Sequence, residues 1–127
     1  MSREFTYTVK KSITEEELRD IIIDGIENSI IYWAFLNNDT SEFERLYDKG
    51  LTTGEAVAEI VLTGGEVEIT DNEGDVEPEY KLTLDRLLRG IELNAIERPH
   101  DCDLENYDAI TCDCIFQYAI FNEVIFG

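Results

Sequence analysis

Basic residues are scarce in this sequence. Lysine and arginine total 10 against 29 aspartates and glutamates, which gives a formal net charge of -19 and an isoelectric point near 4.1. No Lys or Arg follows Arg98. Such a charge repels phosphates, so we expect no direct binding to DNA, RNA or an anionic membrane. The partner that it favours is a basic protein surface, although the same charge could serve only to keep the protein dispersed.

Cysteine and histidine are also rare, with three and one in the chain. The number of cysteines is odd, and two of them, Cys112 and Cys114, are separated by a single residue; the third is Cys102. This is a poor disulfide framework, so we predict a reducing, cytoplasmic compartment. Together with His100 the cysteines do not match the spacing of paired zinc-binding cysteines. We therefore expect no metal and no cofactor, and we interpret Cys112 and Cys114 as small buried side chains.

Long apolar runs and common catalytic motifs are missing as well. The sequence has no run of 18 apolar residues and no apolar signal core near its first residues, so we expect neither a membrane span nor a secretory leader. It has neither a Gly-x-Ser-x-Gly nucleophile motif nor a glycine-rich phosphate loop, and its one histidine, His100, follows a proline in a polar segment. These absences predict a protein that is not an enzyme.

Clear periodicity is present in the 127 residues, of which 43% are hydrophobic, enough for a single domain over residues 1–127. The strongest pattern lies in residues 12–38, which we predict to be a long central helix. Thr14 and Glu17 have the spacing of a capping box. Gly25 interrupts this helix and predicts the close approach of another backbone. The apolar stripe at helical spacing comprises Leu18, Ile21, Ile22, Ile26, Ile30 and Trp33.

The remaining pattern predicts an α+β fold. Alternation of apolar and polar residues predicts strands at 4–10, 66–70 and 77–83, the last two forming an acidic hairpin. Helical patterns begin at capping residues near Ser41, Thr52, Thr83 and Asp108. We therefore expect a small antiparallel sheet, made of the N-terminal strand and the hairpin, packed with four to five helices.

The acidic hairpin is the candidate partner-binding site. Between residues 66 and 79 the sequence has seven acids and no base. Glu66 and Glu68 should share the outer face of a strand about 6.6 Å apart, so a row of carboxylates could compete with nucleic-acid phosphates for a groove lined by Lys and Arg. A charged edge strand that only prevents aggregation is the alternative. The candidate residues are Glu66, Glu68, Asp71, Glu73, Asp75, Glu77 and Glu79.

The last helix and the tail that follows it are apolar on most sides, which is typical of a central helix or of one shared between subunits. A homodimer is therefore a possible assembly. The candidate interface residues are Phe116, Ile120, Phe121, Val124, Ile125 and Phe126.

Two other functions remain open. A protein that sequesters a signal nucleotide or another small molecule would need cations for phosphate, and Arg86, Arg89 and Arg98 are the candidates. Arg86 and Arg89 are three residues apart and should share a helix face. The second alternative is a structural oligomerisation module, for which the apolar C-terminal segment is the relevant feature.

Several segments, in this order, carry a resemblance to a known group. They are Gly25, Ile31–Trp33, Gly64–Gly65, Leu82–Asp85, Gly90–Ile91 and Gln117–Gly127. The chain resembles small acidic proteins carried by phages and mobile elements of Firmicutes. It departs from that pattern at Asn122, where Gly is expected, and at Ile31, where a polar residue is common. The group has no established activity, so the resemblance carries over no site residues. It implies a host bacterial cell and favours counter-defence, such as inhibition of a CRISPR effector or another nucleic-acid-binding immune protein.

Overall fold

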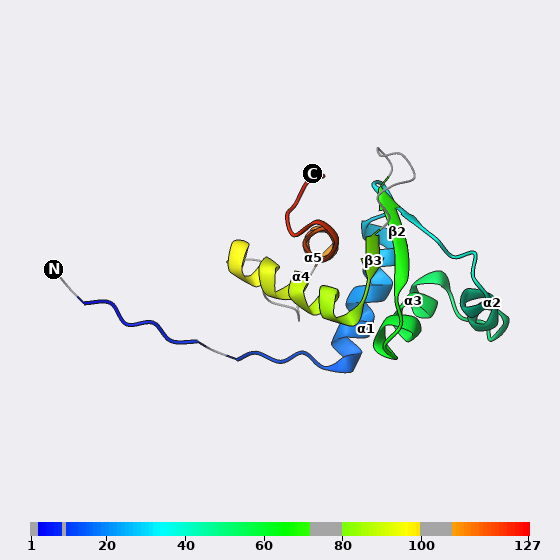
Figure 1. Cartoon of the computed structure of the whole chain (residues 1–127), viewed down its shortest axis with the longest axis horizontal. Coiled ribbons are helices and arrows are strands. Elements are labelled where there is room, and N and C mark those ends of the chain that lie inside the picture. The colour runs from blue at the N-terminus through cyan, green and yellow to red at the C-terminus, as the bar shows by residue number, and fades with distance from the viewer. Residues whose placement is uncertain (1–2, 9, 72–79, 100–107) are drawn as a thin grey trace.

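The computed structural model describes residues 3–8, 10–71, 80–99 and 108–127 (Figure 1). These residues form five α-helices, one π-helical turn and a small antiparallel sheet, so the predicted α+β class is confirmed. Among them no helix has both the length and the apolar character needed to cross a membrane. The elements are α1 (Glu15–Asp24), η1 (Gly25–Ser29), β1 (Ala34–Leu36), α2 (Ser41–Asp48), α3 (Thr53–Leu62), β2 (Val67–Asp71), β3 (Tyr80–Leu82), α4 (Leu84–Glu97) and α5 (Ala109–Phe121).

Helix α1 begins at the predicted capping box. The backbone N–H of Glu17 donates to Thr14 Oγ1 at 3.1 Å, and the Glu17 carboxylate accepts from the Thr14 N–H at 3.3 Å. Two N–H groups that the first helical turn leaves without partners are thereby satisfied. The predicted apolar stripe is confirmed because all six of its side chains are buried.

The central helix is shorter than predicted. Its α-helical part ends at Asp24, a π-helical turn follows over Gly25–Ser29, and Ala34–Leu36 forms a strand instead of the end of a helix. The Ser29 hydroxyl donates to the Asp24 carbonyl at 3.3 Å within the widened turn. Residues 30–36 are mostly β-branched, aromatic or leucine, and such residues suit a sheet once a partner strand is available. Pairing with β2 supplies that partner.

The predicted strand at residues 4–10 is also corrected. Residues 3–8 and 10 have neither helical nor strand structure, and the segment runs extended away from the helices (Figure 1). The third strand of the sheet is β1, which pairs antiparallel with β2, while β2 pairs antiparallel with β3. The first predicted hairpin strand is present one residue later, as β2, and β3 covers Tyr80–Leu82 within the second, whose residues 77–79 lie outside the described residues.

The continuous segment formed by α1 and η1 lies at the centre of the core. It packs against α3 on one side and α5 on the other, and α5 in turn packs along α4. A side-chain carbon added at Gly25 would collide with the ring of Phe116. The close approach at this glycine is therefore made by an aromatic side chain, and our prediction of a backbone was wrong. The close backbone approach occurs at Gly90 in α4, where an added carbon would meet the Ile115 carbonyl and the Ala119 nitrogen.

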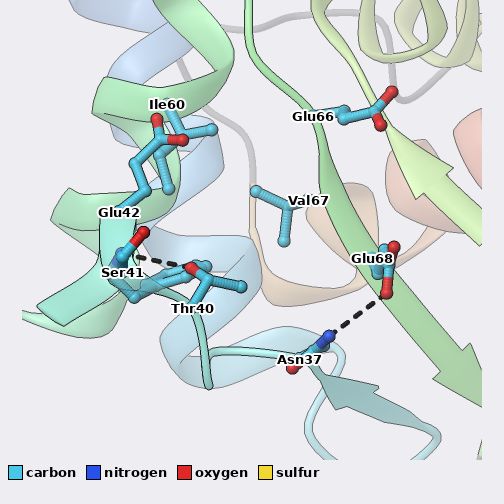
Figure 2. A pocket seen from close by; sticks show the side chains of 9 residues that line it. Asn37, Thr40, Ser41, Glu42, Ile60, Glu66, Val67 and Glu68 are labelled. Atoms are coloured by element: carbon cyan, nitrogen blue, oxygen red, sulfur yellow. Dashed lines mark hydrogen bonds between the residues drawn. The ribbon is translucent and has the colours of Figure 1, made fainter.

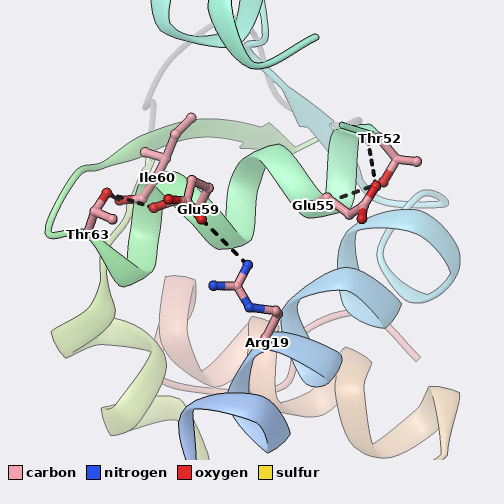
Figure 3. A network of polar contacts seen from close by, with 6 residues as sticks. All are labelled: Arg19, Thr52, Glu55, Glu59, Ile60 and Thr63. Atoms are coloured by element: carbon pink, nitrogen blue, oxygen red, sulfur yellow. Dashed lines mark hydrogen bonds and ion pairs between the residues drawn. The ribbon is translucent and has the colours of Figure 1, made fainter. Parts of the chain in front are cut away.

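Capping residues position the other helices (Figure 3). Thr52 and Glu55 form a capping box at the start of α3, and an ion pair of 3.6 Å between Arg19 and Glu59 connects α1 to α3. At α2 the cap is Thr40, one residue before the predicted Ser41, because the Thr40 hydroxyl accepts from the Phe43 N–H at 3.2 Å. Threonine and serine are both favoured N-cap residues, so the sequence alone did not distinguish Thr40 from Ser41.

Helix α5 ends at Asn122, which has a left-handed backbone with φ of 62°. Glycine is the residue expected at such a position, and asparagine is among the non-glycine residues that best tolerate this conformation. The turn at Asn122 sends the last five residues back along α5, where they pack against Trp33 and Gln117.

Candidate functional site

A hollow of about 220 Å³ lies between the N-terminal end of α2 and strand β2 (Figure 2). Phe43, Ile60 and Val67 form its apolar part. Its acidic side chains are Glu42 on α2 and Glu66 and Glu68 on the β2 side, and no lysine or arginine is among the residues that line it. The apolar part of such a hollow can receive the aliphatic stem of a lysine or arginine. Glu42 is the carboxylate on the α2 side, whereas Glu66 and Glu68 line the β2 side with their side chains directed to the other face of the strand, so a cationic partner would have to contact both faces.

Glu66 and Glu68 lie as the sequence predicted, on the same face in the β2 segment. In Figure 2 both side chains point away from Val67, which is 2% exposed and faces the core. Glu68 is further positioned by Asn37, whose side-chain nitrogen donates to the carboxylate at 3.1 Å and whose backbone N–H donates to the Glu68 carbonyl at 3.0 Å. The carboxylate of Glu68 is therefore held in place at the end of β1.

The acidic face is less uniform than the sequence suggested. Lys81 on β3 is the residue paired with Glu68, and its ammonium lies 3.3 Å from the carboxylate of Glu66. Residues 66–79 contain no base in sequence, but antiparallel pairing places a base of the neighbouring strand, Lys81, beside them in space. Both partners of the ion pair are about half exposed, so the pair is weak and a competing cation can displace Lys81.

The other predicted acids are divided between two places. Asp71 is the last residue of β2 and pairs with Ala34 of β1. Glu73, Asp75, Glu77 and Glu79 lie outside the described residues. Glu42 belongs to the site but was missed, because it lies 24 positions before Glu66 in a separate helix. In the sequence, Glu42 stands out only as an acid in the first turn of a helix, where the helix dipole favours negative charge, and this does not connect it with Glu66.

The three candidate phosphate-binding arginines do not form one site. Arg86 and Arg89 are exposed on α4, and Arg89 lies 3.1 Å from Glu92. Arg98 is at the C-terminal cap of the same helix. Twelve residues of helix separate Arg86 from Arg98, which is about 18 Å at 1.5 Å per residue. One phosphate group cannot contact residues so far apart.

The predicted oligomer interface is largely internal. Phe116 and Ile120 are buried in the core, so this part of the prediction is corrected: they pack inside one chain. Phe121 and Phe126 are half-buried and contact Trp33, with ring centroids 5.3 Å and 5.6 Å away. Val124 and Ile125 are exposed. Helix α5 is apolar on most sides because it lies inside the core of one chain. Of the two interpretations of its composition, a central helix and a helix shared between subunits, the first is the one observed for Phe116 and Ile120.

Cys112 and Cys114 are buried and not disulfide-bonded, as their apolar surroundings predicted. Burial, with a smaller contribution from Asp24, raises the pKa of the Cys112 thiol to about 12. The thiol is therefore protonated and unreactive near neutral pH. Among the described residues no group of three His, Cys, Asp or Glu side chains is placed to bind a metal ion, and His100 and Cys102 lie outside those residues.

A second polar cluster, missed by sequence analysis, surrounds Asp113 in α5. Its carboxylate accepts hydrogen bonds from the Tyr32 hydroxyl, from Trp33 Nε1 at 2.7 Å and from Gln117 Nε2 at 3.0 Å. Gln117 lies four residues from Asp113 on the same helix, but Tyr32 and Trp33 lie 81 and 80 residues before it, and no spacing in the sequence indicates that they meet. The cluster joins α5 to the segment between η1 and β1, which is a structural role.

Comparisons with family models, with curated proteins and with solved structures give no match to this chain. The functional argument therefore rests on the hollow and its charges.

Proposed function

We propose that this protein is a non-enzymatic inhibitor carried by a phage or mobile element. In this proposal its acidic surface occupies a basic, nucleic-acid-binding groove of a host defence protein, as an anti-CRISPR or another counter-defence protein would. The mobile-element setting rests on the resemblance described above. The binding mode rests on one structural observation, the hollow whose charged lining residues are Glu42, Glu66 and Glu68.

The chemistry of the hollow fits a groove built to bind phosphates. Such grooves present lysine and arginine at intervals that match the nucleic-acid backbone, and arginine binds carboxylates in the same forked geometry as phosphates. Glu66 and Glu68 are separated by about 6.6 Å along an extended strand, which is similar to the spacing of successive phosphates. The net charge of -19 adds a long-range attraction that speeds association at low salt.

The nucleotide-sequestering alternative is not favoured by any specific observation, because the arginines that it needs are spread along α4. The role of structural module does not require an acidic hollow.

The test is capture from a lysate of the bacterial host with the tagged protein, comparing two triple variants. Glu42→Lys/Glu66→Lys/Glu68→Lys reverses the hollow, while Asp20→Lys/Glu97→Lys/Glu123→Lys reverses three exposed acids elsewhere and changes the net charge equally. We expect the unmodified protein to capture a basic nucleic-acid-binding protein that added nucleic acid or high salt releases. The first variant should lose this partner and the second should retain it.

Two results would contradict the proposal. If the captured protein survives reversal of the hollow, the binding site lies elsewhere. If both variants lose the partner to the same extent, only the overall charge matters and the hollow has no specific role.

A further inference from the structure

The N-terminal arm, defined here as residues 3–8 and 10, is an extended segment that leaves the folded body (Figure 1). Its two aromatic side chains, Phe5 and Tyr7, are 79% and 85% exposed. They alternate with Thr6 and Thr8, so an extended backbone places both rings on one side and both hydroxyls on the other. The guanidinium of Arg3, also in the arm, lies over the ring of Phe5 at 5.1 Å from the ring centroid. An exposed aromatic face of this kind indicates an interaction site.

Strand β1 offers a suitable edge. It is the end strand of the sheet, with β2 on one side. Asn37 donates its backbone N–H to the Glu68 carbonyl, so the alternation of an antiparallel ladder directs the backbone groups of Leu36 away from β2. An edge of this kind can accept a further strand through backbone hydrogen bonds.

An apolar hollow of about 140 Å³ lies beside this edge. A strand added next to β1 would place every second side chain on the inner face of the sheet, over this hollow. Phe5 and Tyr7 have the required spacing of two residues. The apolar residues that line the hollow are Ile26, Ile30, Ile31, Ala34, Leu36 and Ile69.

Charge also favours contact between the arm and a folded body of this chain. The first 11 residues contain three bases and one acid, whereas the other 116 contain seven bases and 28 acids. In one copy the arm leaves at the N-terminal end of α1, and β1 follows only after the 15 residues of α1 and η1, a helical length of about 22 Å. The arm and the edge therefore begin at opposite ends of the same helical segment, and in Figure 1 the arm runs away from the sheet instead of back along that segment, which suits exchange between two copies.

We propose that the N-terminal arm of one copy adds as a strand to the β1 edge of a second copy, with Phe5 and Tyr7 over the apolar hollow. Reciprocal exchange of two arms closes a twofold dimer and leaves no arm unpaired. This dimer does not depend on the acidic hollow at Glu42, and it can be tested with the purified protein alone.

The test is the mass in solution, measured by sedimentation equilibrium across a range of concentrations. We expect a dimer of the 14.6 kDa chain that weakens as salt screens the attraction between arm and body. Phe5→Ser/Tyr7→Ser should raise the dissociation constant at least about tenfold, because two aromatic rings per arm lose their apolar contacts. Thr6→Ser/Thr8→Ser changes the opposite side of the same arm and should leave the dissociation constant unchanged.

A mixing experiment distinguishes exchange between copies from folding of the arm onto its own body. Leu36→Pro removes an outward N–H from the β1 edge, and its fold is checked by circular dichroism. Leu36→Pro alone and Phe5→Ser/Tyr7→Ser alone should each be monomeric. A mixture of the two should form a heterodimer, because the first supplies an intact arm and the second an intact edge. A monomeric unmodified protein, or a dimer that survives Phe5→Ser/Tyr7→Ser, would overturn the proposal. If Leu36→Pro does not fold, the two arm variants alone decide.

Discussion

The side-chain amide of Gln117 binds both backbone groups of Phe126. Its oxygen accepts the Phe126 N–H at 2.8 Å, and its nitrogen donates to the Phe126 carbonyl at 2.9 Å. The same oxygen accepts the Ile125 N–H at 2.8 Å, and the same nitrogen donates to Asp113 at 3.0 Å. Gln117 is fully buried, so these contacts satisfy a polar group that would otherwise be costly inside the protein. They hold the C-terminal tail on α5, with Phe126 stacked on Trp33.

Replacement of Gln117 by leucine should therefore release the tail. Leucine keeps an apolar group of similar size but leaves the N–H groups of Ile125 and Phe126 without an acceptor. We expect the free energy of unfolding to fall by about 2 kcal/mol in urea titrations. The fluorescence of Trp33, the only tryptophan, should change as its contact with Phe126 is lost.

Ile125→Ala is the matched control. It shortens an exposed side chain of the same tail but leaves the backbone hydrogen bonds to Gln117 intact. Its effect should stay within about 0.5 kcal/mol. Equal stability losses in the two variants would show that the side-chain amide does not hold the tail.

Gly25→Ala should destabilise the core although alanine is the better helix former. Alanine normally gains about 1 kcal/mol over glycine inside a helix. Here the added carbon collides with the ring of Phe116, which is fully buried. We expect a net loss of about 2 kcal/mol or more in urea titrations.

A double-variant cycle tests the cause of that loss. Phe116→Leu removes the part of the ring that meets the new carbon. Gly25→Ala/Phe116→Leu should therefore be more stable than the sum of the two single losses implies. Strict additivity would mean that Phe116 is not the group that excludes alanine from position 25.

Tyr32 should give the protein a pH-dependent stability in the alkaline range. Burial, and then the hydrogen bond to Asp113, raise the pKa of Tyr32 from its usual value of 10 to about 12. The folded protein therefore keeps this proton more tightly than the unfolded chain does. The contribution is fully present below pH 10 and is lost as the pH rises through about 12.

This prediction can be checked by urea titrations at several alkaline pH values. Tyr32→Phe should reduce the fall in stability with pH between about 10 and 12, because phenylalanine has no proton to lose. The unmodified protein is the reference, and a slope that stays the same in Tyr32→Phe would mean that Tyr32 does not titrate with folding.

Much of the helical structure could be predicted because its signals are local. Thr14 and Glu17 form the capping box that their spacing predicted, and Thr52 and Thr83 cap the helices that follow them. Gly50 and Gly64 adopt the left-handed backbone expected at helix ends. Each of these features depends on residues within one helical turn, so the sequence contains all of the information.

The two wrong strand and helix assignments share a physical cause. Residues 4–10 alternate like a strand, and residues 30–36 continue a helical stripe, yet it is residues 34–36 that pair with β2. Strand pairing depends on which segment lies beside β2 after the helices pack. Intrinsic preference does not decide this choice, since β-propensity mainly reflects the surroundings.

The sequence by itself determined the acidity of the chain, the α+β class, the caps and the buried stripe that runs from Leu18 to Trp33. Only the tertiary structure decided which strand completes the sheet, that Lys81 lies opposite Glu68, and that Glu42 shares a hollow with Glu66. It also decided that Gln117 and Asp113 hold the tail and the aromatic segment against α5. The first group of features depends on composition and on contacts within a few residues. The second depends on contacts between segments far apart in the chain, which exist only when the whole core has formed.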